Sequence, residues 1–521
     1  MTKSKLTIAA LCLAMASPSF AGGLLTNTNQ NIAFNRMMSR EASIGIDGVY
    51  SNPAGVAFLS DGAHLSLNWQ LAFQSRTIKN DYSLFTNNTE DATTPREFKG
   101  KAFAPVIPSI QFAYNWKNFS FQTNFSVGGG GGKCTFDNGL GSFEKIVSET
   151  ALAACGLAQV VDGALGSQTF SNDAMLGKTG SYSFNSYMRG RQYYYGLSLG
   201  AAYKINSDLS VFAGVRGVYA LCNYYGYVKD IKVGNTELYK LLDPTRANSA
   251  DIELNCDQSG VGFTPILGVD YKLGRWNFSA KYEFKTRMRL KNEAVNQVPS
   301  IGGLSGNLVT QITSAYVAAG VPQEQAIGIV TQKLSNEKVV STMSNLKDQF
   351  DSKINEAIGE YEDGKKIAGD IPALLTVGVG VNPIDPLKIN VGFHYFWDKQ
   401  ATSYNHREEK LDRGTMEWNA GVEYDASKLV TVSAGWQNTN YGITSEYMDD
   451  KSFVVSSNSI GAGVCLHVSK KIDVNLAYFC TLYGHKKTSE DVTLSESMKY
   501  TYSSDYTRTN HVFGAGVDIN F

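Results

Sequence analysis

The end of the chain constrains its fold most. Residues 510–521 alternate strictly between two kinds of side chain and stop on an aromatic residue. Such a period of two is typical of a strand whose two faces meet different surroundings. A strand that runs to the last residue suits a sheet whose final strand is locked in place, either in a soluble protein or in a closed barrel. One face carries Phe513, Ala515, Val517, Ile519 and Phe521, and the other carries Val512, Gly514, Gly516, Asp518 and Asn520.

This segment resembles the closing strand of a bacterial outer-membrane β-barrel, where a C-terminal Phe such as Phe521 is common. The start of the chain favours that interpretation over a soluble sheet. Residues 1–21 combine a basic beginning, an apolar stretch and the small-residue pattern Ser19-Phe20-Ala21, as a secretory signal peptide does. We therefore predict a signal peptide over 1–21 and a mature chain from Gly22.

Alternating segments recur along the rest of the chain, and about fourteen of them can be counted, an even number as single-chain bacterial barrels have. Short turns alternate with longer, more polar connections, which is the asymmetry of periplasmic turns and outer loops. The sequence predicts an all-β transmembrane antiparallel barrel over 61–521. The strands are expected near 62–75, 103–116, 118–129, 188–204, 208–225, 260–273, 275–290, 371–382, 387–399, 413–425, 428–440, 457–469, 472–486 and 507–521.

Composition agrees with a barrel. Charged residues make up 18% of the chain, against roughly 25% in soluble domains. The 28 Tyr and 26 Phe suit aromatic girdles. A net charge of −1 gives no reason to expect nucleic-acid binding.

Two predicted outer loops, 130–185 and 291–370, are unusually long. Their helical stretches, near 143–165 and 324–358, favour folded loops over the barrel mouth. The alternative is surface decoration, since loops beyond about 15 residues are either functional or disordered.

Residues 22–60 precede the first strand and can fold back into the lumen as a hatch, or plug. They contain Asn52-Pro53-Ala54, which resembles the NPA motif of the FadL family. Those are outer-membrane transporters of long-chain fatty acids and, in toluene-porin relatives, of aromatic hydrocarbons. The resemblance implies a 14-stranded barrel with an N-terminal hatch. Since Pro53 fixes its φ and Asn52 can bond nearby backbone, we interpret the motif as a rigid turn that holds the hatch and does not contact substrate.

The family mechanism implies capture by outer loops, passage to a lumen pocket and sideways exit near a kinked third strand. Here the third expected strand runs directly into five glycines, which weaken strand pairing. They are the candidate lateral opening, and the alternative is a flexible entry to the loop. These glycines are Gly128, Gly129, Gly130, Gly131 and Gly132.

A fatty-acid carboxylate in an apolar pocket needs a cation, whereas a neutral substrate needs none. In 276–289 the alternation places the basic residues inward and Phe278, Phe284 and Met288 outward. Each cation can instead form a lumen salt bridge, for instance with Glu283. The candidates are Arg189, Arg191, Arg216, Lys281, Lys285, Arg287 and Arg289.

Six cysteines remain after the signal, and an exported protein permits disulfides. Cys134 with Cys155, and Cys222 with Cys256, can each close a loop. No Cys–His cluster has the spacing of a metal site, so we expect neither metal nor cofactor.

Three functions remain: a transporter of hydrophobic small molecules, a general or solute-selective porin, and a barrel enzyme such as an outer-membrane phospholipase. The inward His394 and His467 have no motif-linked nucleophile, so we expect no enzyme. A porin does not need the hatch. We expect a monomer in a Gram-negative outer membrane, whose partners are its hydrophobic substrate, outer-membrane lipid and lipopolysaccharide, and the barrel-assembly machinery.

Overall fold

The structure is a computed structural model, and it describes residues 24–168, 170–171, 179–494 and 498–521. The predicted signal peptide, residues 1–21, lies outside the described residues.

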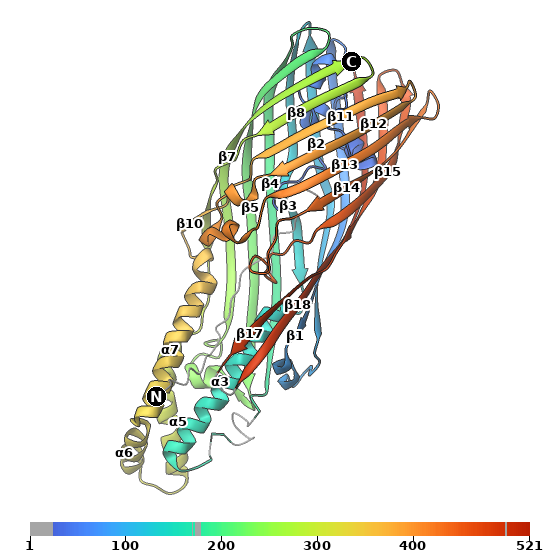
Figure 1. Cartoon of the computed structure of the whole chain (residues 1–521). Helices are drawn as coiled ribbons and strands as arrows, with labels where there is room; N and C mark the ends of the chain where they lie inside the picture. The colour runs from blue at the N-terminus through green and yellow to red at the C-terminus, as the bar shows by residue number, and fades with distance from the viewer. Residues whose placement is uncertain (1–23, 169, 172–178, 495–497) are drawn as a thin grey trace.

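The strands form one closed antiparallel barrel (Figure 1). It has fourteen barrel strands, some of which consist of two labelled segments. The seam is the pairing of the first and last strands, in which Leu65 lies opposite Ile519 and Asp81 opposite Ser503. The predicted strand count and closing strand are therefore confirmed. The strands are β1 (Gly62–Asp81), β2 (Arg96–Trp116), β3 (Phe119–Phe136), β4 (Tyr182–Lys204), β5 (Leu209–Val233), β7 (Ile252–Leu273), β8 (Trp276–Glu283) continued by β9 (Arg289–Ala294), β11 (Leu374–Ile384) preceded by β10 (Lys366–Ala368), β12 (Leu387–Phe396), β13 (Thr415–Asp425), β14 (Val430–Asn440), β15 (Ser457–Ser469), β16 (Ile472–Tyr483) continued by β17 (Lys486–Thr493), and β18 (Lys499–Asn520), with β6 (Thr236–Glu237) a short partner of β5.

The two ends of the barrel differ. The end with short turns, here called the turn end, is uppermost in Figure 1, and the helices gather at the opposite end, the helix end. The predicted helix 143–165 is confirmed, whereas 324–358 is two helices, and a further one at 304–318 was not predicted. The helix-end elements are α3 (Gly141–Leu165), α4 (Tyr239–Leu242), α5 (Leu304–Ala318), α6 (Gln323–Leu334) and α7 (Glu337–Ile358), and the short 3₁₀ turns are η2 (Ser83–Asn87), η3 (Ile301–Gly303), η4 (Gly359–Tyr361), η5 (Asp398–Gln400) and η6 (Tyr404–Lys410).

Alternation sorts the side chains as predicted over most of the wall. Along β1, Leu67, Trp69 and Phe73 are exposed on the outer face, while Ser66 and Gln70 are buried on the inner face. An apolar outer surface and a polar lumen are the pattern of a barrel that lies in lipid.

The predicted alternation fails beyond Glu283. β8 ends there and β9 begins at Arg289, and Thr286 between them forms an isolated bridge with Ile371. This irregular segment shifts the phase by one residue, so Met288 is buried inside and Arg287 is exposed outside. A shift of one residue exchanges the faces of all following side chains.

Residues 24–60, here called the lumenal segment, lie inside the barrel. They contain α1 (Ile32–Met37), α2 (Gly48–Ser51) and the 3₁₀ turn η1 (Gly55–Phe58), and nearly all their side chains are buried. α1 packs against β13 to β16 and β18. The segment is the blue chain within the upper part of the barrel in Figure 1.

Glycines on the inner wall make room for this segment. A Cβ at Gly435 or Gly421 would overlap the carbonyl oxygen of Met37, and one at Gly461 would overlap that of Asn35. Eight glycines of the wall therefore serve a close approach of the lumenal segment that a side chain would block. The lining glycines are Gly378, Gly392, Gly421, Gly435, Gly461, Gly463, Gly514 and Gly516.

Candidate functional site

The wall has a break between β2 and β3. Gly100–Ala102 pair with Phe136–Cys134, and Ser109–Trp116 pair with Ser126–Phe119, but the residues between them do not pair. On its other edge β3 stays paired with β4, with irregularities at Val127/Gly129 and Gly130/Gly132. The glycine run thus lies on an edge of β3 that β2 does not cover.

Two of these glycines require their residue type. Gly130 and Gly132 have φ of 76° and 78°, a left-handed conformation that favours glycine. A Cβ at Gly130 would also lie 2.5 Å from the carbonyl oxygen of Gln192. By contrast, a Cβ at Gly128 would meet only an ordinary contact, at 3.9 Å from the Tyr194 oxygen. The two irregularities in the pairing of β3 with β4 fall within this glycine run, as expected of β-bulges.

Leu25–Asn27, near the start of the lumenal segment, closes this break from inside the barrel. The Asn27 amide donates to the Gly128 oxygen at 3.0 Å, and the Gly130 amide donates to the Leu25 oxygen at 3.1 Å. Thr26 thereby pairs with Gly129 as a short antiparallel bridge. Leu25–Asn27 therefore takes the position on β3 that β2 leaves empty.

Side chains reinforce this closure on both strands. Asn27 Nδ2 donates to the Gly130 oxygen at 2.9 Å, and Gln30 Nε2 donates to the Val127 oxygen at 3.1 Å. The Gln30 carbonyl in turn accepts from Ser109 Oγ at 2.5 Å and Gln111 Nε2 at 3.0 Å, both on β2. The segment is thus held to each side of the break by hydrogen bonds.

A small cavity lies directly behind the closure. Its volume is about 20 Å³. A cavity needs roughly 10–15 Å³ to hold one water molecule, so in this state it holds little more than that. It is lined by Thr26, Gly128, Tyr194, Gly196, Arg216, Val218, Thr264, Glu283, Thr286, Ile371, Pro372 and Leu374.

A buried charge cluster adjoins the cavity. Arg216 donates to both Glu283 oxygens, at 2.6 and 3.1 Å, and Lys281 Nζ lies 2.8 Å from the same carboxylate. The Tyr50 ring lies 5.5 Å from the Arg216 guanidinium and 4.4 Å from Lys281 Nζ. Two cations share one carboxylate, so the group keeps a positive excess.

Tyr50 connects this cluster to the closure. Its hydroxyl donates to the Asn27 carbonyl at 3.0 Å, and its own carbonyl accepts from Lys281 Nζ at 2.7 Å. A change around Lys281 is therefore two contacts away from the strand that fills the break.

Solved structures with a similar fold are known. No protein-family model matches the sequence, and no curated protein matches it. A FadL homologue from Pseudomonas aeruginosa matches with a TM-score of 0.59 and 14% identity, covering 98% of this chain and 100% of that one. This chain has the FadL fold. The Pseudomonas putida toluene transporter TodX matches with a TM-score of 0.50 and 14% identity, covering 92% of this chain and 94% of that one.

In this FadL-type barrel, only some of the seven predicted cations reach the lumen. Arg216 and Lys281 do, as described above. Arg189 and Arg191 lie on the outer face of β4. The prediction that Lys285, Arg287 and Arg289 follow Lys281 inward is wrong, because of the phase shift after Glu283. Lys285 bonds the Gln400 oxygen at 2.9 Å, Arg289 lies 3.0 Å from Asp370, and Arg287 is exposed.

Two other lumen cations were not predicted from the sequence. Arg76 and Arg508 lie directly opposite each other across the seam, and both are buried. Their guanidinium groups lie 5.7 Å from the Phe453 ring and 5.2 Å from the Tyr483 ring. Extending the inward phase of the closing strand from Val512 back to Arg508 would have found one of them.

The Asn52-Pro53-Ala54 turn is anchored to three strands. Asn52 Nδ2 donates to Asp270 on β7 at 2.5 Å, Gln122 on β3 donates to the Pro53 oxygen at 2.7 Å, and Ser210 on β5 donates to the Ala54 oxygen at 2.8 Å. These contacts join α2 to η1 and fix the turn on the wall.

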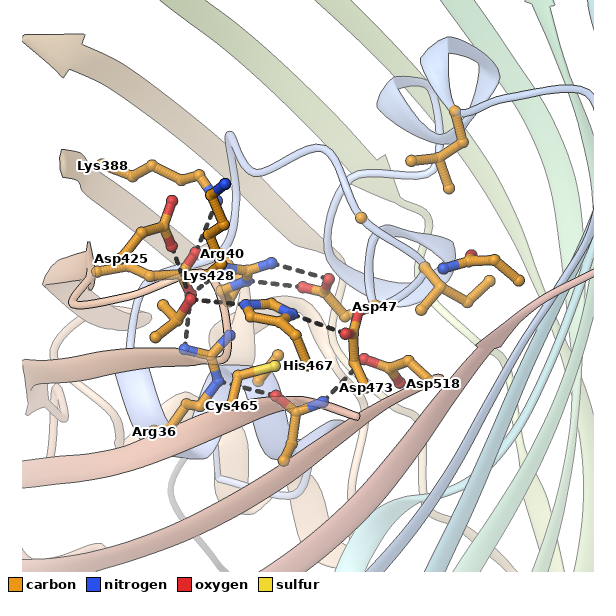
Figure 2. Close-up of a pocket in the computed structure, with 18 of the residues that line it drawn as sticks. Arg36, Arg40, Asp47, Lys388, Asp425, Lys428, Cys465, His467, Asp473 and Asp518 are labelled. Atoms are coloured by element: carbon orange, nitrogen blue, oxygen red, sulfur yellow. Dashed lines mark hydrogen bonds and ion pairs between the residues drawn. The ribbon is translucent and has the colours of Figure 1, made fainter. Parts of the chain in front are cut away.

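A polar pocket of about 690 Å³ opens at the turn end between the lumenal segment and the wall. Figure 2 shows Arg36 and Arg40 entering it from the segment. Arg36 lies 2.6 Å and Arg40 3.4 Å from Glu423 on β13, and Lys388 lies 2.9 Å from the same carboxylate. Arg40 also pairs with Asp47 at 2.8 Å. These ion pairs anchor α1 to the barrel.

The same pocket contains three side chains whose ligand atoms lie close enough to bind one metal ion. The ligand atoms of Cys465, His467 and Asp473 lie within 4.8 Å of one another. This cluster was not predicted from the sequence, because Asp473 comes from the next strand, β16. His467 already bonds Asp473 through Nδ1 at 2.7 Å and Thr431 through Nε2 at 2.9 Å, so an ion would have to replace these contacts. A second such group, His406, Glu408 and Glu409, lies in a helix-end loop.

The predicted disulfides are absent. Cys134, Cys155, Cys222 and Cys256 are buried, and none of the four forms a disulfide bond. Cys256 lies opposite Tyr224 and Cys222 opposite Gln258, so the second pair is offset by two residues. Cys134 lies on β3 and Cys155 within α3. No loop is closed by either pair.

An apolar cavity lies among the helices at the helix end. It has a volume of about 60 Å³ and no polar surface. α3 is long and apolar enough to cross a membrane, yet more than half of it is buried in the protein. The cavity is lined by residues that include Leu157, Val161, Leu241, Leu304, Leu308 and Leu346.

The base of α3 is tied to the last strand. Asp450 accepts from the Ser142 amide at 2.7 Å and from the Tyr506 hydroxyl at 2.9 Å. Burial raises the pKa of Asp450, and the neighbouring Asp449 raises it further. The protonation of one loop carboxyl therefore affects how α3 is held.

Proposed function

We propose that this protein carries hydrophobic small molecules through an outer membrane and releases them sideways, through the break between β2 and β3, into the lipid. A molecule enters at the apolar cavity among α3, α4, α5 and α7, passes to the lumen cavity and leaves past the glycine run. The observation that carries the proposal is a break in the wall that, among the described residues, the lumenal segment closes at Leu25–Asn27 and Gln30. The FadL fold and the description of one relative as a toluene transporter support it.

The attachment of the lumenal segment favours a sideways path over a straight one. At the turn end α1 is fixed by Arg36 and Arg40 and lies against glycines that fit its backbone. At the break, short hydrogen-bonded contacts hold Leu25–Asn27, and each such bond contributes about 1 kcal/mol net. The contacts that open most easily are therefore those beside the lipid.

The lining supports an amphiphile with one anionic group, such as a long-chain fatty acid. The helix-end cavity offers an apolar surface for a chain, and the Arg216–Lys281–Glu283 cluster offers a positive excess for a carboxylate. A neutral hydrocarbon would use the same path without that cluster.

Tyr50 supplies a link between binding and opening. A carboxylate that draws Lys281 from the Tyr50 carbonyl would loosen the residue whose hydroxyl holds Asn27. Substrate binding would then favour release of the closing strand, because a ligand shifts a conformational equilibrium by its difference in affinity for the two states.

A crosslink across the closure tests the exit. Thr26 and Gly129 form the pair of an antiparallel bridge that exchanges no hydrogen bonds, for which the Cα separation is about 4.5 Å, within the range of a disulfide. Thr26→Cys with Gly129→Cys, in a background with the native cysteines replaced by alanine, should lose uptake of a radiolabelled fatty acid when oxidised. Reduction should restore uptake.

The reduced double variant is the first control, because a Cβ at Gly129 would lie 2.9 Å from the Leu25 oxygen and can disturb the closure by itself. The single variants under the same oxidant are the second control. Full uptake by the crosslinked protein would exclude the sideways exit. Deleting residues 24–60 should raise conductance in planar bilayers, and a wild-type barrel that already conducts as strongly would support a porin instead.

A further inference from the structure

The outer face of β1 to β4 and β18 changes from aromatic to basic at one level. Phe73, Phe103 and Phe513 are exposed there, and the Phe73 ring lies 5.0 Å from Phe103 and 6.4 Å from Phe513. Such a girdle marks the edge of the apolar band of a barrel. The next outward positions toward the helix end carry Lys101 on β2 and Lys133 on β3.

The basic residues crowd one another. Lys133 lies directly opposite Arg191 of β4 in the strand register. Lys101 lies opposite Thr135, the next outward position from Lys133. Like charges directly opposite each other destabilise a sheet. An anion bound between these three cations on adjacent strands would relieve their repulsion.

In the part of the chain that the structure describes, these cations are not ion-paired with a carboxylate. None of Lys101, Lys133 and Arg191 forms an ion pair with a described residue, and the Nε of Arg191 is buried without a hydrogen-bond partner. Asp137 borders the site as a single carboxylate. The cluster keeps a positive excess at the level where lipid headgroups begin.

A groove joins the cations to the aromatic girdle. It has a volume of about 800 Å³, and Phe73, Phe103, Lys101, Lys133 and Thr135 line it. Ser75, Thr509 and His511 complete the lining. One end is apolar and the other is basic and rich in hydroxyl groups, which is the complement of a lipid with a charged headgroup.

We propose that this groove binds a phosphorylated lipid of the outer leaflet, with a phosphate on Lys101 and Lys133, next to which Arg191 lies in the strand register, and an acyl chain along Phe73 and Phe103. A phosphate fits better than a carboxylate, because it carries up to two charges and three strong acceptor oxygens, which suits more than one cation. Lipopolysaccharide has this chemistry. Since Lys101 and Lys133 lie on opposite sides of the break, a bound phosphate bridges β2 and β3 just beyond it.

The test uses the full-length protein in detergent. Native mass spectrometry would compare a bisphosphorylated lipopolysaccharide, the same lipid after enzymatic dephosphorylation, and oleate. We expect retention of the phosphorylated lipid and binding weakened about tenfold or more by dephosphorylation or by Lys101→Gln with Lys133→Gln, since charge-assisted hydrogen bonds are lost. Lys99→Gln, an exposed lysine on the same face of β2 outside the groove, should bind like the wild type.

Equal binding of the dephosphorylated lipid, or undiminished binding by the double variant, would overturn the proposal. Binding of oleate without binding of the phosphorylated lipid would also overturn it, and would indicate that the groove receives released substrate instead. The substituted residues Lys99, Lys101 and Lys133 are exposed on the outer face. The heat-dependent gel mobility of the barrel should therefore remain unchanged in these variants, and it serves as the control for folding.

Discussion

Weakening the closure at the β2–β3 break should make the transporter faster. Asn27→Ala with Gln30→Ala removes the side-chain bonds of these residues to β3, and the two shortest join Asn27 Nδ2 to the Gly130 oxygen and Gln30 Nε2 to the Val127 oxygen. The backbone bonds of Asn27 and Gly130 remain. The segment should still close the break, but less firmly.

The size of the effect follows from those two bonds. Each contributes about 1 kcal/mol net, so the closed state loses about 2 kcal/mol relative to the open one, which raises the open fraction roughly 30-fold when it is small. The initial rate of fatty-acid uptake into proteoliposomes should rise by up to this factor. A rate limited by capture at the helix end would rise less.

Asn35→Ala is the matched control. Asn35 is as deeply buried as Asn27 and donates to Gln70 on β1 at 2.8 Å, but it does not touch β3. Its uptake rate should stay near that of the wild type. An unchanged rate in the double variant, or an equal rise in Asn35→Ala, would refute the idea that Leu25–Asn27 limits release.

Three further predictions concern the support of this site. Gly435→Ala should lower the thermal midpoint of unfolding, by a destabilisation of about 1–3 kcal/mol, because its Cβ meets the Met37 carbonyl; Gly217→Ala, with no atom nearer than 3.7 Å, is the control and should unfold normally. Glu423→Gln should destabilise the barrel by about 3–5 kcal/mol in chemical denaturation, since it leaves buried cations uncompensated; an unaltered midpoint would count against the anchor. Because the pKa of Asp450 is raised in the folded loop, docking of α3 should strengthen as pH falls from neutral toward the usual carboxyl pKa and weaken as it rises; hydrogen exchange of α3 should show this, and Asp450→Asn should abolish it.

Elements set by local alternation could be predicted from the sequence. The closing strand, the strand count and the helix at 143–165 follow from periodicity, and the turn at Asn52-Pro53-Ala54 follows from the restricted backbone of proline. The glycine run could be predicted as a weak point of its strand, since successive glycines weaken strand pairing.

Elements that depend on partners distant in sequence could not be predicted. The phase shift after Glu283 arises where Thr286 pairs with Ile371. The bridge of Thr26 with Gly129 is too short to show a period. The opposition of Lys133 and Arg191 needs the register of β3 against β4. These three features decide which cations reach the lumen, what closes the break and where the outer cations gather.

The glycine-lined wall limits how far the lumenal segment can travel. α1, which begins at Ile32 after its Asn31 cap, lies in a bed shaped to its backbone, whereas the seven residues 24–30 lie toward the break. Seven residues span at most about 25 Å. A hinge near Asn31 would let that arm swing away from β3 while α1 stays seated, so lipid-soluble cargo could leave while the turn end stays sealed. The cell could then take up hydrophobic compounds through this barrel without becoming more permeable to water-soluble toxins.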